Sequence, residues 1–481
     1  MNKKDYSEYF VKPSLKEAVK RTKTTTEIVK DEYKLDEKYL LGKDKTYFIR
    51  TFGCQANLRD EETIAGILEL MGYTKSEDIT KSDIILLNTC AVRENAEERV
   101  FGEVGHLKAI RQINPDVIFG VCGCMVQQES IVEEILKRAP HIDLIFGTHN
   151  INRLPELIYQ TYMSKERVVE VFSKEGEVYE NLPVKRNDSL KAWVNIMYGC
   201  DKFCTYCIVP YTRGKERSRL LADIIEEVKC LKEQGYKEVT LLGQNVNAYG
   251  KDLKLGYDFA TLLEECAKTG IERIRFTTSH PWNFTDRMVD VIAKYDNIMN
   301  HIHLPIQSGS DEILRKMARR YTYAEYKELY NKLRDTLPNC SITTDIIVGF
   351  PNETEEQFQK TLDAVNELEY DSAFTFIYSP REGTPAAKMV DNVPMEVKKE
   401  RFNRLVEAVT RSAKKRNEAY VGKVLKVLVE GPSKKNEDVL SGYSEENKLV
   451  NFKGSKDLVG KIVNVKITLA KSWTLEGEAI E

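Results

Sequence analysis

The sequence predicts an α/β protein that ends in a small all-β module. Short apolar runs rich in β-branched residues alternate with helical stretches over residues 45–163, and the same alternation resumes over residues 186–416. From residue 418 the helical stretches stop, and short strands follow one another to the end of the chain. A chain of 481 residues is long enough for about three domains. These boundaries therefore predict two β/α domains followed by a third, all-β domain over residues 418–481.

The first β/α array follows a Lys- and Glu-rich extension, residues 1–44, which we expect to be solvated and partly helical and to which we assign no function. The array has predicted strands at 47–51, 83–87, 117–121 and 143–146, with helices between them at 58–71, 94–113 and 128–138. Short apolar strands separated by helices predict a parallel, doubly wound sheet.

One cysteine follows the end of each of the first three strands of this sheet: Cys54, Cys90 and Cys124. Ligands of open parallel sheets bind at the carboxyl ends of the strands, so these three thiols are expected to converge. A single such cysteine would more often belong to the core, but three in one topological position favour an iron–sulfur cluster. Three of the remaining cysteines are expected in the core: Cys230, Cys266 and Cys340. The fourth, Cys122, is expected in the core or beside the cluster.

The second array begins after a polar linker near residues 165–189. Its predicted strands are 192–197, 238–242, 271–277, 301–305, 341–348 and 373–378, with helices such as 221–234, 259–268 and 355–368 between them. Six βα units predict a partial parallel barrel, a (β/α)6 barrel, whose chemistry takes place at the C-terminal strand ends. Glycine and small polar residues stand at these ends, although ordinary βα turns use them too.

The first strand of this barrel leads into three cysteines on one short loop, Cys200, Cys204 and Cys207, in the pattern C-x₃-C-x₂-C. Thiolates are the preferred ligands of 4Fe–4S clusters, and three of them hold three of the four irons. The fourth iron can then bind another molecule, which a cluster needs for chemistry beyond electron transport. A zinc site or disulfides are the alternatives, but zinc normally takes four ligands, and no fourth Cys or His lies near in the sequence.

The C-terminal module follows a basic helix at 397–416 and has predicted strands at 423–430, 449–452, 461–469 and the last few residues. These short strands predict a small barrel. Basic runs are usually solvated faces, so the sequence leaves nucleic-acid contact by this module open. The balance of 72 Lys and Arg against 75 Asp and Glu does not point to a nucleic-acid partner either.

No segment reads as a membrane span or a signal peptide. The longest apolar run, residues 117–126, is too short to cross a bilayer, and the first 44 residues contain no hydrophobic region. We therefore expect a cytoplasmic protein with no membrane partner, whose cysteines are ligands or buried thiols rather than disulfides.

The loop Cys200–Cys207 resembles the signature of the radical S-adenosylmethionine (SAM) superfamily, in which Tyr206 matches the aromatic position before the last cysteine. The two cysteine triads together with the small β-module resemble the methylthiotransferase family over nearly all of residues 45–481. This resemblance implies an N-terminal domain with an auxiliary 4Fe–4S cluster, a radical SAM core and a C-terminal TRAM-type RNA-binding barrel. Within the family, the stretches 88–97 and 210–219 resemble the bacterial tRNA-modifying members.

The resemblance also implies roles for single residues. The triad Cys200, Cys204 and Cys207 would hold the SAM-binding cluster, and Cys54, Cys90 and Cys124 would hold the auxiliary one. Cofactor-binding positions that match the family are Tyr206, Gly243, Gln244, Ser279 and Gln307. Three charged residues would meet the substrate or the SAM carboxylate, or else form a structural ion-pair cluster: Arg213, Glu216 and Arg219.

The implied reaction converts N6-(dimethylallyl)adenosine at tRNA position 37, next to the anticodon, to its 2-methylthio form. One SAM is reduced and cleaved to a 5′-deoxyadenosyl radical that abstracts the hydrogen from adenine carbon 2, the auxiliary cluster supplies sulfur, and a second SAM supplies the methyl group. The implied partners are the anticodon stem-loop of isopentenylated tRNA and an unidentified electron donor. Two alternatives stay open: a sister methylthiotransferase acting on threonylcarbamoyladenosine or on a ribosomal-protein aspartate, and, in a different class, a two-cluster electron-transfer protein.

Overall fold

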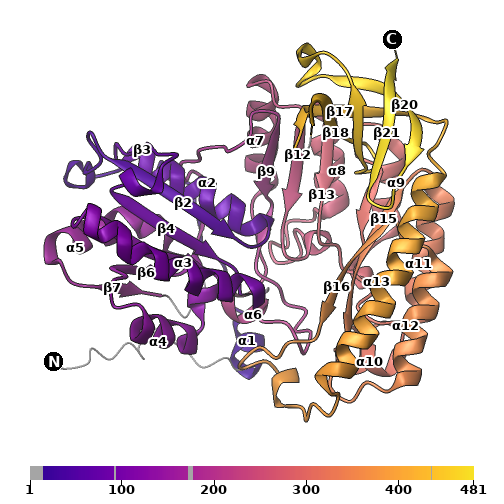
Figure 1. The fold of residues 1–481 in the computed structure, drawn as a ribbon, viewed down its shortest axis with the longest axis horizontal. Helices are drawn as coiled ribbons and strands as arrows, with labels where there is room; N and C mark the ends of the chain where they lie inside the picture. The colour runs from indigo at the N-terminus through magenta and orange to yellow at the C-terminus, as the bar shows by residue number, and fades with distance from the viewer. Residues whose placement is uncertain (1–14, 92–93, 172–176, 435, 481) are drawn as a thin grey trace.

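The structure, a computed structural model, describes residues 15–91, 94–171, 177–434 and 436–480. Figure 1 shows a parallel sheet with its helices, a β/α array beside it, and a small all-β barrel in yellow at one end of that array. The predicted α/β class with a C-terminal all-β barrel is confirmed. Within the described residues, no helix is long and apolar enough to cross a membrane.

The N-terminal sheet has the strand order β3-β2-β4-β5-β6-β7, and every neighbouring pair is parallel. The order reverses between β2 and β4, which makes their carboxyl ends the topological switch point where open α/β sheets bind ligands. The strands are β2 (Thr46–Phe52), β3 (Thr74–Lys75), β4 (Ile84–Thr89), β5 (Ile118–Gly123), β6 (Leu144–Phe146) and β7 (Val168–Glu170).

Helices cover both faces of this sheet because its central strands are apolar on both sides. In β4, Ile84 and Leu86 pack against α2 (Gln55–Leu70) and α5 (Leu154–Ser164), whereas Ile85 and Leu87 pack against α3 (Glu94–Ile113) and α4 (Glu129–Arg138). All six residues of β4 are buried. Such continuous apolar strands are typical of parallel sheets covered on both faces, so the predicted doubly wound sheet is confirmed.

The core array contains all six predicted strands, in two three-stranded parallel sheets of order β13-β12-β9 and β14-β15-β16. A parallel bridge between Ile274 and Ile298 brings the two sheets together, which gives an open partial barrel. Its strands are β9 (Lys191–Asn195), β12 (Glu238–Leu242), β13 (Arg273–Phe276), β14 (His301–His303), β15 (Ser341–Val348) and β16 (Ser372–Ile377).

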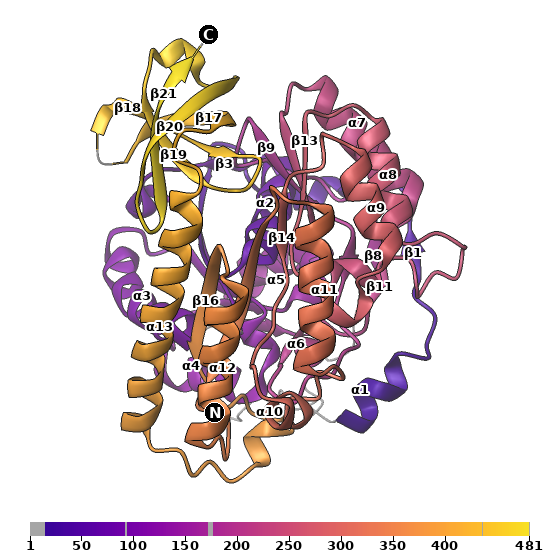
Figure 2. The same ribbon diagram turned by 90° about the vertical axis from the view of Figure 1, so that its right-hand side faces the viewer.

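Helices surround the outside of this barrel, as Figure 2 shows for α8, α9, α11, α12 and α13. Two of them, α11 and α12, begin with a capping box. In each box the side chain of the N-cap threonine, Thr322 or Thr354, accepts from the backbone N–H three residues later, and the side chain of that later residue accepts from the backbone N–H of the threonine. The helices are α6 (Val209–Thr212), α7 (Leu221–Glu233), α8 (Phe259–Lys268), α9 (Asp286–Lys294), α10 (Asp311–Lys316), α11 (Tyr323–Thr336), α12 (Glu355–Leu368) and α13 (Met395–Glu418). A short antiparallel pair, β10 (Met197–Tyr198) and β11 (Arg217–Ser218), flanks the loop that carries Cys200, Cys204 and Cys207.

The C-terminal module is a closed barrel of five strands in the order β17-β18-β19-β21-β20. They are β17 (Val424–Ser433), β18 (Asn436–Ser444), β19 (Leu449–Lys453), β20 (Ile462–Ala470) and β21 (Thr474–Ile480). The sequence predicted the other strands but missed β18. Its first half is exposed and polar, so no apolar alternation marks it in the sequence.

Two arginines of the core hold this barrel against the N-terminal end of β13. Arg273 donates to the carbonyl oxygens of Tyr443 and Lys426, both at 2.8 Å. Arg275 donates to the carbonyl oxygens of Ser444 at 2.7 Å and Glu445 at 3.2 Å. Both arginine side chains are buried, so the C-terminal barrel is attached by fixed, desolvated hydrogen bonds.

Six charged side chains form a second buried contact, between the N-terminal domain, the linker and the core. Its shortest ion pairs, each 2.6 Å, join Glu227 to Arg186 and to Arg219, and Arg219 to Glu180. The pairs Arg186–Glu62, at 3.0 Å, and Arg59–Glu227, at 3.9 Å, complete the network. Three arginines therefore neutralise three glutamates at this interface.

The described part of the N-terminal extension lies across both β/α domains. It contains α1 (Leu15–Arg21) and β1 (Ile28–Val29), and β1 pairs with β8 (Val178–Tyr179) of the linker. The Tyr33 hydroxyl donates to the carbonyl oxygen of Asn152 at 2.6 Å, and Lys215 of the core donates to the Thr24 hydroxyl at 3.0 Å. The exact domain boundaries stay predictions from the sequence.

Candidate functional site

The first cysteine triad lies in one row along the carboxyl edge of the N-terminal sheet. Phe52, Thr89 and Gly123 are register partners on the adjacent strands β2, β4 and β5. Cys90 and Cys124 are the next residues of their strands, and Cys54 follows Phe52 after Gly53. Cys90 and Cys124 are buried, whereas Cys54 is half-buried. The structure therefore brings Cys54, Cys90 and Cys124 together as the strand ends predicted.

Asn57, on the first turn of α2, connects the three cysteine-bearing loops. Its Oδ1 lies 3.4 Å from the sulfur of Cys54 and 3.9 Å from that of Cys124. Its amide group donates to the carbonyl oxygen of Thr89 at 2.8 Å, just before Cys90. One buried amide thus holds the ends of three strands in a fixed arrangement.

Two glycines allow the backbone to approach closely at this edge. A Cβ atom on Gly53 would lie 2.6 Å from the Cβ of Cys90. Gly123 has φ +98, and a Cβ there would lie 2.4 Å from the carbonyl oxygen of Thr89. Neither position accepts a larger residue without moving the strand ends.

The electrostatics of this edge favour negative charge on the sulfur of Cys54 and disfavour it on that of Cys124. Cys54 is the N-cap residue of α2, where helix N–H groups and the helix dipole stabilise a thiolate. Its hydrogen bond with Cys90, together with the nearby positive charge of Arg213, lowers the pKa of Cys54 to about 5 despite burial. Burial raises the pKa of Cys124 to about 12 in the cluster-free chain, although Arg213 opposes the shift.

The second triad, Cys200, Cys204 and Cys207, lies on the loop that leaves β10 at the C-terminal end of the barrel. Hydrogen bonds fix this loop at both ends: Cys200 N–H donates to the carbonyl oxygen of Gly214 at 3.1 Å, and Thr205 N–H donates to that of Met317 at 3.1 Å. Arg319 donates to the sulfur of Cys204 at 3.5 Å. Burial raises the pKa of Cys200 well above its usual range and that of Cys207 to about 12.

The two triads face each other across a direct contact between their loops. Ala91 and Cys124 of the N-terminal sheet form a small buried cluster with Ile208, the residue after Cys207. Arg213, in the loop after α6, donates from Nε to the sulfur of Cys124 at 3.0 Å and from Nη2 to Asp60 at 2.6 Å. Residues far apart in the sequence therefore form a single site.

A cavity of about 1230 Å³ connects the triads with the barrel interior. Its lining includes Cys54 on one side, Cys200, Cys204 and Cys207 at the C-terminal strand ends, and Trp473 of the C-terminal barrel at the far end. Such a volume is larger than most single-ligand pockets and accommodates a nucleoside-sized ligand together with part of a larger molecule.

Several polar atoms that line this cavity are buried and have no hydrogen-bond partner within the described chain. Among them are Asn245 Oδ1, Ser279 Oγ and Gln307 Oε1. An unpaired buried polar atom is costly unless a ligand satisfies it. Thr278 and Gln307 also have positive φ values, 68° and 69°, which for non-glycine residues indicates backbone strain held in place at a functional site.

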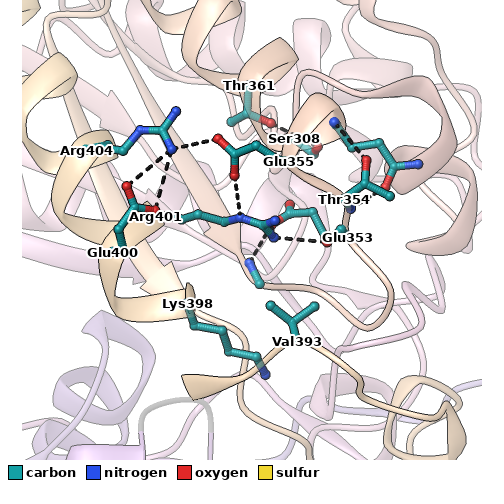
Figure 3. A network of polar contacts seen from close by, with 12 residues as sticks. Ser308, Glu353, Thr354, Glu355, Thr361, Val393, Lys398, Glu400, Arg401 and Arg404 are labelled. Carbon is teal, nitrogen blue, oxygen red and sulfur yellow. Dashed lines mark hydrogen bonds and ion pairs between the residues drawn. The ribbon is translucent and has the colours of Figure 1, made fainter. Parts of the chain in front are cut away.

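The ends of β14 and β15 are fixed by a polar network on the outer helices, shown in Figure 3. Ser308, next to Gln307, bonds the hydroxyl of Thr361 on α12 at 3.2 Å. Glu353 accepts from the backbone N–H of Gly349 at 2.8 Å and from Arg401 at 3.1 Å. These contacts keep the strand ends in position behind the cavity.

The donor sets fit iron–sulfur clusters better than a single metal ion. Among the described side chains, no group of three His, Cys, Asp or Glu residues is close enough to hold one ion. A 4Fe–4S cluster spreads its thiolates over separate irons, so its cysteines stand further apart. Each site offers three thiols, and Arg213 or Arg319 donates to one sulfur of each. A 4Fe–4S cluster held by three thiolates keeps one iron open.

The other predicted site residues lie in different places. Tyr206, Gln244, Ser279 and Gln307 line the cavity, whereas Gly243 lies behind it against Met197 and is not among the described lining residues. Arg219 pairs with Glu180 and Glu227 in the buried interface network. Of the two roles predicted for Arg219, ligand contact or a structural ion-pair cluster, the structure shows the ion-pair cluster.

Arg213 contacts the first triad, and Glu216 accepts from Asn245 at 3.0 Å behind the cavity. Within the stretch 88–97, residues 92–93 lie outside the described part of the chain, as do the side chains of 94–97.

The expectation for Cys230 was wrong. Cys266, Cys340 and Cys122 are buried, but Cys230 is exposed. On α7 the buried positions are Ile224, Val228 and Leu231, and Cys230 lies off that face. The position of Cys230 in a helical stretch suggested a core position, although its helical phase does not.

Sequence reasoning missed Asn57, Asn245 and Arg319. Arg319 donates to the carbonyl oxygen of Pro305 at 3.0 Å, at the end of β14, as well as to Cys204. Its only sequence signal is its place beyond a short helix that follows a strand end.

Comparisons with known proteins agree with this site. The model of the Radical SAM superfamily matches residues 194–365, that of the uncharacterized protein family UPF0004 matches residues 46–147, and that of the TRAM domain matches residues 418–480. The fold resembles the radical S-adenosylmethionine methyltransferase TsrM from Kitasatospora setae, with TM-score 0.52 and 14% identity over 71% of this chain and 77% of that one. Fold, cysteine loop and matched models define the chain as a radical SAM protein.

Similarity over the whole length narrows the class further. The chain is 59% identical to the tRNA-2-methylthio-N(6)-dimethylallyladenosine synthase of Bacillus subtilis (strain 168), over 100% of this chain and 95% of that protein. It is 59% identical to the proteins of the same name from Anoxybacillus flavithermus and Geobacillus thermodenitrificans, each over 99% of this chain and 92% of the relative. The chain belongs to this family of radical SAM methylthiotransferases.

Proposed function

We propose that this chain is an enzyme that converts N6-(dimethylallyl)adenosine in tRNA to its 2-methylthio form, with SAM and 4Fe–4S clusters as cofactors. The observation that carries the proposal is the direct contact between the loops that carry the two cysteine triads, beside one cavity. Cys124 of one triad packs against Ile208, next to Cys207 of the other. A carbon–sulfur bond at an unreactive aromatic carbon needs a radical source and a sulfur source close together, and this arrangement provides a place for both.

The two triads would act as the cluster ligands: Cys200, Cys204 and Cys207 for the SAM-binding cluster, and Cys54, Cys90 and Cys124 for the auxiliary one. When bound, the clusters supply the electron that cleaves SAM and the sulfur that is inserted. The loops of the chain hold both triads in largely buried positions.

The buried oxygens of the cavity would hold SAM. Ser279 and Gln307 present unpaired oxygen atoms at the ends of β13 and β14, on the same side of the cavity as the Cys200–Cys207 loop. These oxygens can accept hydrogen bonds from the amino and hydroxyl groups of SAM. Arg319, buried beside Cys204, places a positive charge where an anionic carboxylate would bind.

A row of aromatic side chains leads from the C-terminal barrel to the cysteines and fits an unpaired RNA strand. Phe374 and Phe376 on β16 are 56% and 39% exposed, and Trp473 of the C-terminal barrel is 54% exposed. All three line the cavity, as does Tyr378 at the cysteine end of the same row. Alternate residues of a strand are about 6.6 Å apart, so successive rings can each contact a base.

We infer that the reacting base is adenosine 37, next to the anticodon. Sequence-specific RNA recognition targets single-stranded loops whose bases can turn outward, and a base must turn outward to enter this cavity. The first electron would come from a separate reductant, and the reaction would take place in the cytoplasm, where tRNA is found.

The test is anaerobic incubation of the reconstituted, reduced protein with SAM and isopentenylated tRNA, followed by mass spectrometry of the digested nucleosides. The expected result is the gain of one methylthio group on the isopentenyladenosine. If 5′-deoxyadenosine forms without this gain, the radical chemistry stands and the substrate is wrong. If protein shown to hold both clusters does neither, the electron-carrier alternative is favoured.

A further inference from the structure

Arg213 belongs to the core domain but binds a cysteine of the N-terminal domain. Its Nε donates to the sulfur of Cys124 at 3.0 Å, and its Nη2 donates to Asp60 at 2.6 Å. The side chain is 7% exposed. The Arg213 carbonyl oxygen accepts from Nη2 of Arg217 at 3.0 Å, so the backbone that carries the guanidinium is also fixed.

The segment from Cys207 to Arg213 therefore touches both cysteine triads. It begins at a ligand position of the second triad, continues through the short helix α6 (Val209–Thr212), and ends at the donor to Cys124. Ile208 packs against Cys124 from the same side. This short segment thus connects a ligand position of one triad with the residue that binds a ligand position of the other.

We propose that Arg213 is a positioning residue that acts on the auxiliary cluster from the other domain. Its hydrogen bond orients the Cys124 sulfur, and its positive charge stabilises the reduced cluster. The inference rests on the proposed function only in that Cys54, Cys90 and Cys124 hold a cluster.

The sign of the effect follows from charge. Reduction adds one electron, and hence one negative charge, to the cluster. A cation and an N–H group at a ligating sulfur stabilise this more negative state, so they raise the reduction potential. The negative charge of Asp60 partly offsets the positive charge of Arg213. Asp60 accepts from Nη2, however, so the Nε–H of Arg213 still donates to the sulfur of Cys124. Removing the guanidinium should therefore shift the potential to more negative values.

The experiment measures the auxiliary cluster alone, in the full chain with Cys200, Cys204 and Cys207 replaced by alanine. Reconstituted protein is titrated with titanium(III) citrate, which gives one electron per titanium as it becomes titanium(IV). Electron paramagnetic resonance follows the reduced cluster. Arg213→Gln should shift the midpoint to more negative potential, and Arg213→Lys, which keeps the charge, should fall between it and the parent.

The matched control is Arg186→Lys, an arginine of the same domain interface that pairs with Glu62 and Glu227 and contacts no cysteine. It should leave the potential and the resonance spectrum unchanged. If it shifts them as far as Arg213→Lys does, Arg213 acts only by holding the domains together and the proposal is wrong.

Two further outcomes are distinguishable. If the parent with the three alanines binds no iron, the auxiliary cluster itself, and with it the proposed function, is wrong. If the parent binds a cluster whose midpoint is the same in Arg213→Gln, only the role of Arg213 is refuted.

With the natural cysteines restored, Arg213→Gln should lower thiolation of tRNA about tenfold, the typical loss when a partner of a metal ligand is removed. Formation of 5′-deoxyadenosine should stay within about twofold, because the SAM end of the site is untouched. An equal loss of both activities would contradict the assignment of Arg213 to the auxiliary cluster.

Discussion

Replacing Glu227 by glutamine tests the buried charge network between the two β/α domains. Glu227 accepts from Arg186 and from Arg219, each at 2.6 Å, and its side chain is only 19% exposed. The substitution keeps the shape of the side chain but leaves three arginines facing two glutamates. Breaking a buried ion pair by removing one partner typically costs about 3–5 kcal/mol.

The pKa of Glu227 gives an independent magnitude. Burial alone would raise this pKa, but the surrounding arginines, Arg219 foremost, lower it from the usual 4.5 to about 2. The difference corresponds to about 3 kcal/mol of stabilisation. Because the folded state holds the proton less tightly, this stabilisation is fully present above pH 4.5. It is lost as the pH falls from 4.5 towards 2.

The assay is urea unfolding of the full chain, followed by circular dichroism and tryptophan fluorescence, for the wild type and Glu227→Gln. We expect a loss of about 3 kcal/mol at pH 7, constant between pH 6 and 8, that begins to shrink below pH 4.5. Glu226→Gln, on the exposed side of the same helix, is the matched control and should change stability by less than about 0.5 kcal/mol. A loss below about 1 kcal/mol at pH 7, or a loss that grows as the pH falls, would refute this reasoning.

Four further predictions concern the site and the cysteines. Cys90→Ala should abolish thiolation and halve the bound iron but leave 5′-deoxyadenosine formation, and full thiolation would remove Cys90 from the ligands. Gln307→Ala should raise the KM for SAM about tenfold, the cost of one hydrogen bond to a charged ligand, without lowering the Tm; an unchanged KM would place SAM elsewhere. Phe374→Ala should weaken tRNA binding about tenfold in a filter assay, whereas Val390→Ala, at an exposed apolar side chain outside the cavity, should not. In native cluster-free protein, iodoacetamide should alkylate the exposed Cys230 well before the buried Cys266, and the reverse order would contradict the burial of these thiols.

The strands and their cysteines were predictable because the signals are local. Apolar β-branched runs mark the central strands. A residue that directly follows such a strand lies at the carboxyl edge of the parallel sheet. Cys54, Cys90 and Cys124 could therefore be grouped from three separate short segments. The strand β18 (Asn436–Ser444) lacks this signal, because hydrogen bonding to its neighbours in a closed barrel, not apolar alternation, determines its conformation.

The partners of the cysteine sulfurs could not be predicted in the same way. Arg213 lies 89 residues from Cys124, and Arg319 lies 115 residues from Cys204. Such pairs depend on how two domains or two barrel elements pack, which no periodicity in the sequence encodes. Arg213 and Arg219 also look alike in the sequence, yet one contacts a sulfur and the other completes a buried ion-pair network.

The attachment of the C-terminal barrel has a consequence for how a nucleotide is selected. Arg273 and Arg275 bond four carbonyl oxygens of the barrel, and Lys448 of the barrel pairs with the buried Asp371 at 3.0 Å, just before β16. Six residues of β16 span about 20 Å. Under the proposed function, an RNA held by the barrel would therefore be presented to the cysteines at a constant spacing. We expect the enzyme to choose its nucleotide by how far that nucleotide lies from the helical stem, so lengthening the RNA loop should move the modification to another base.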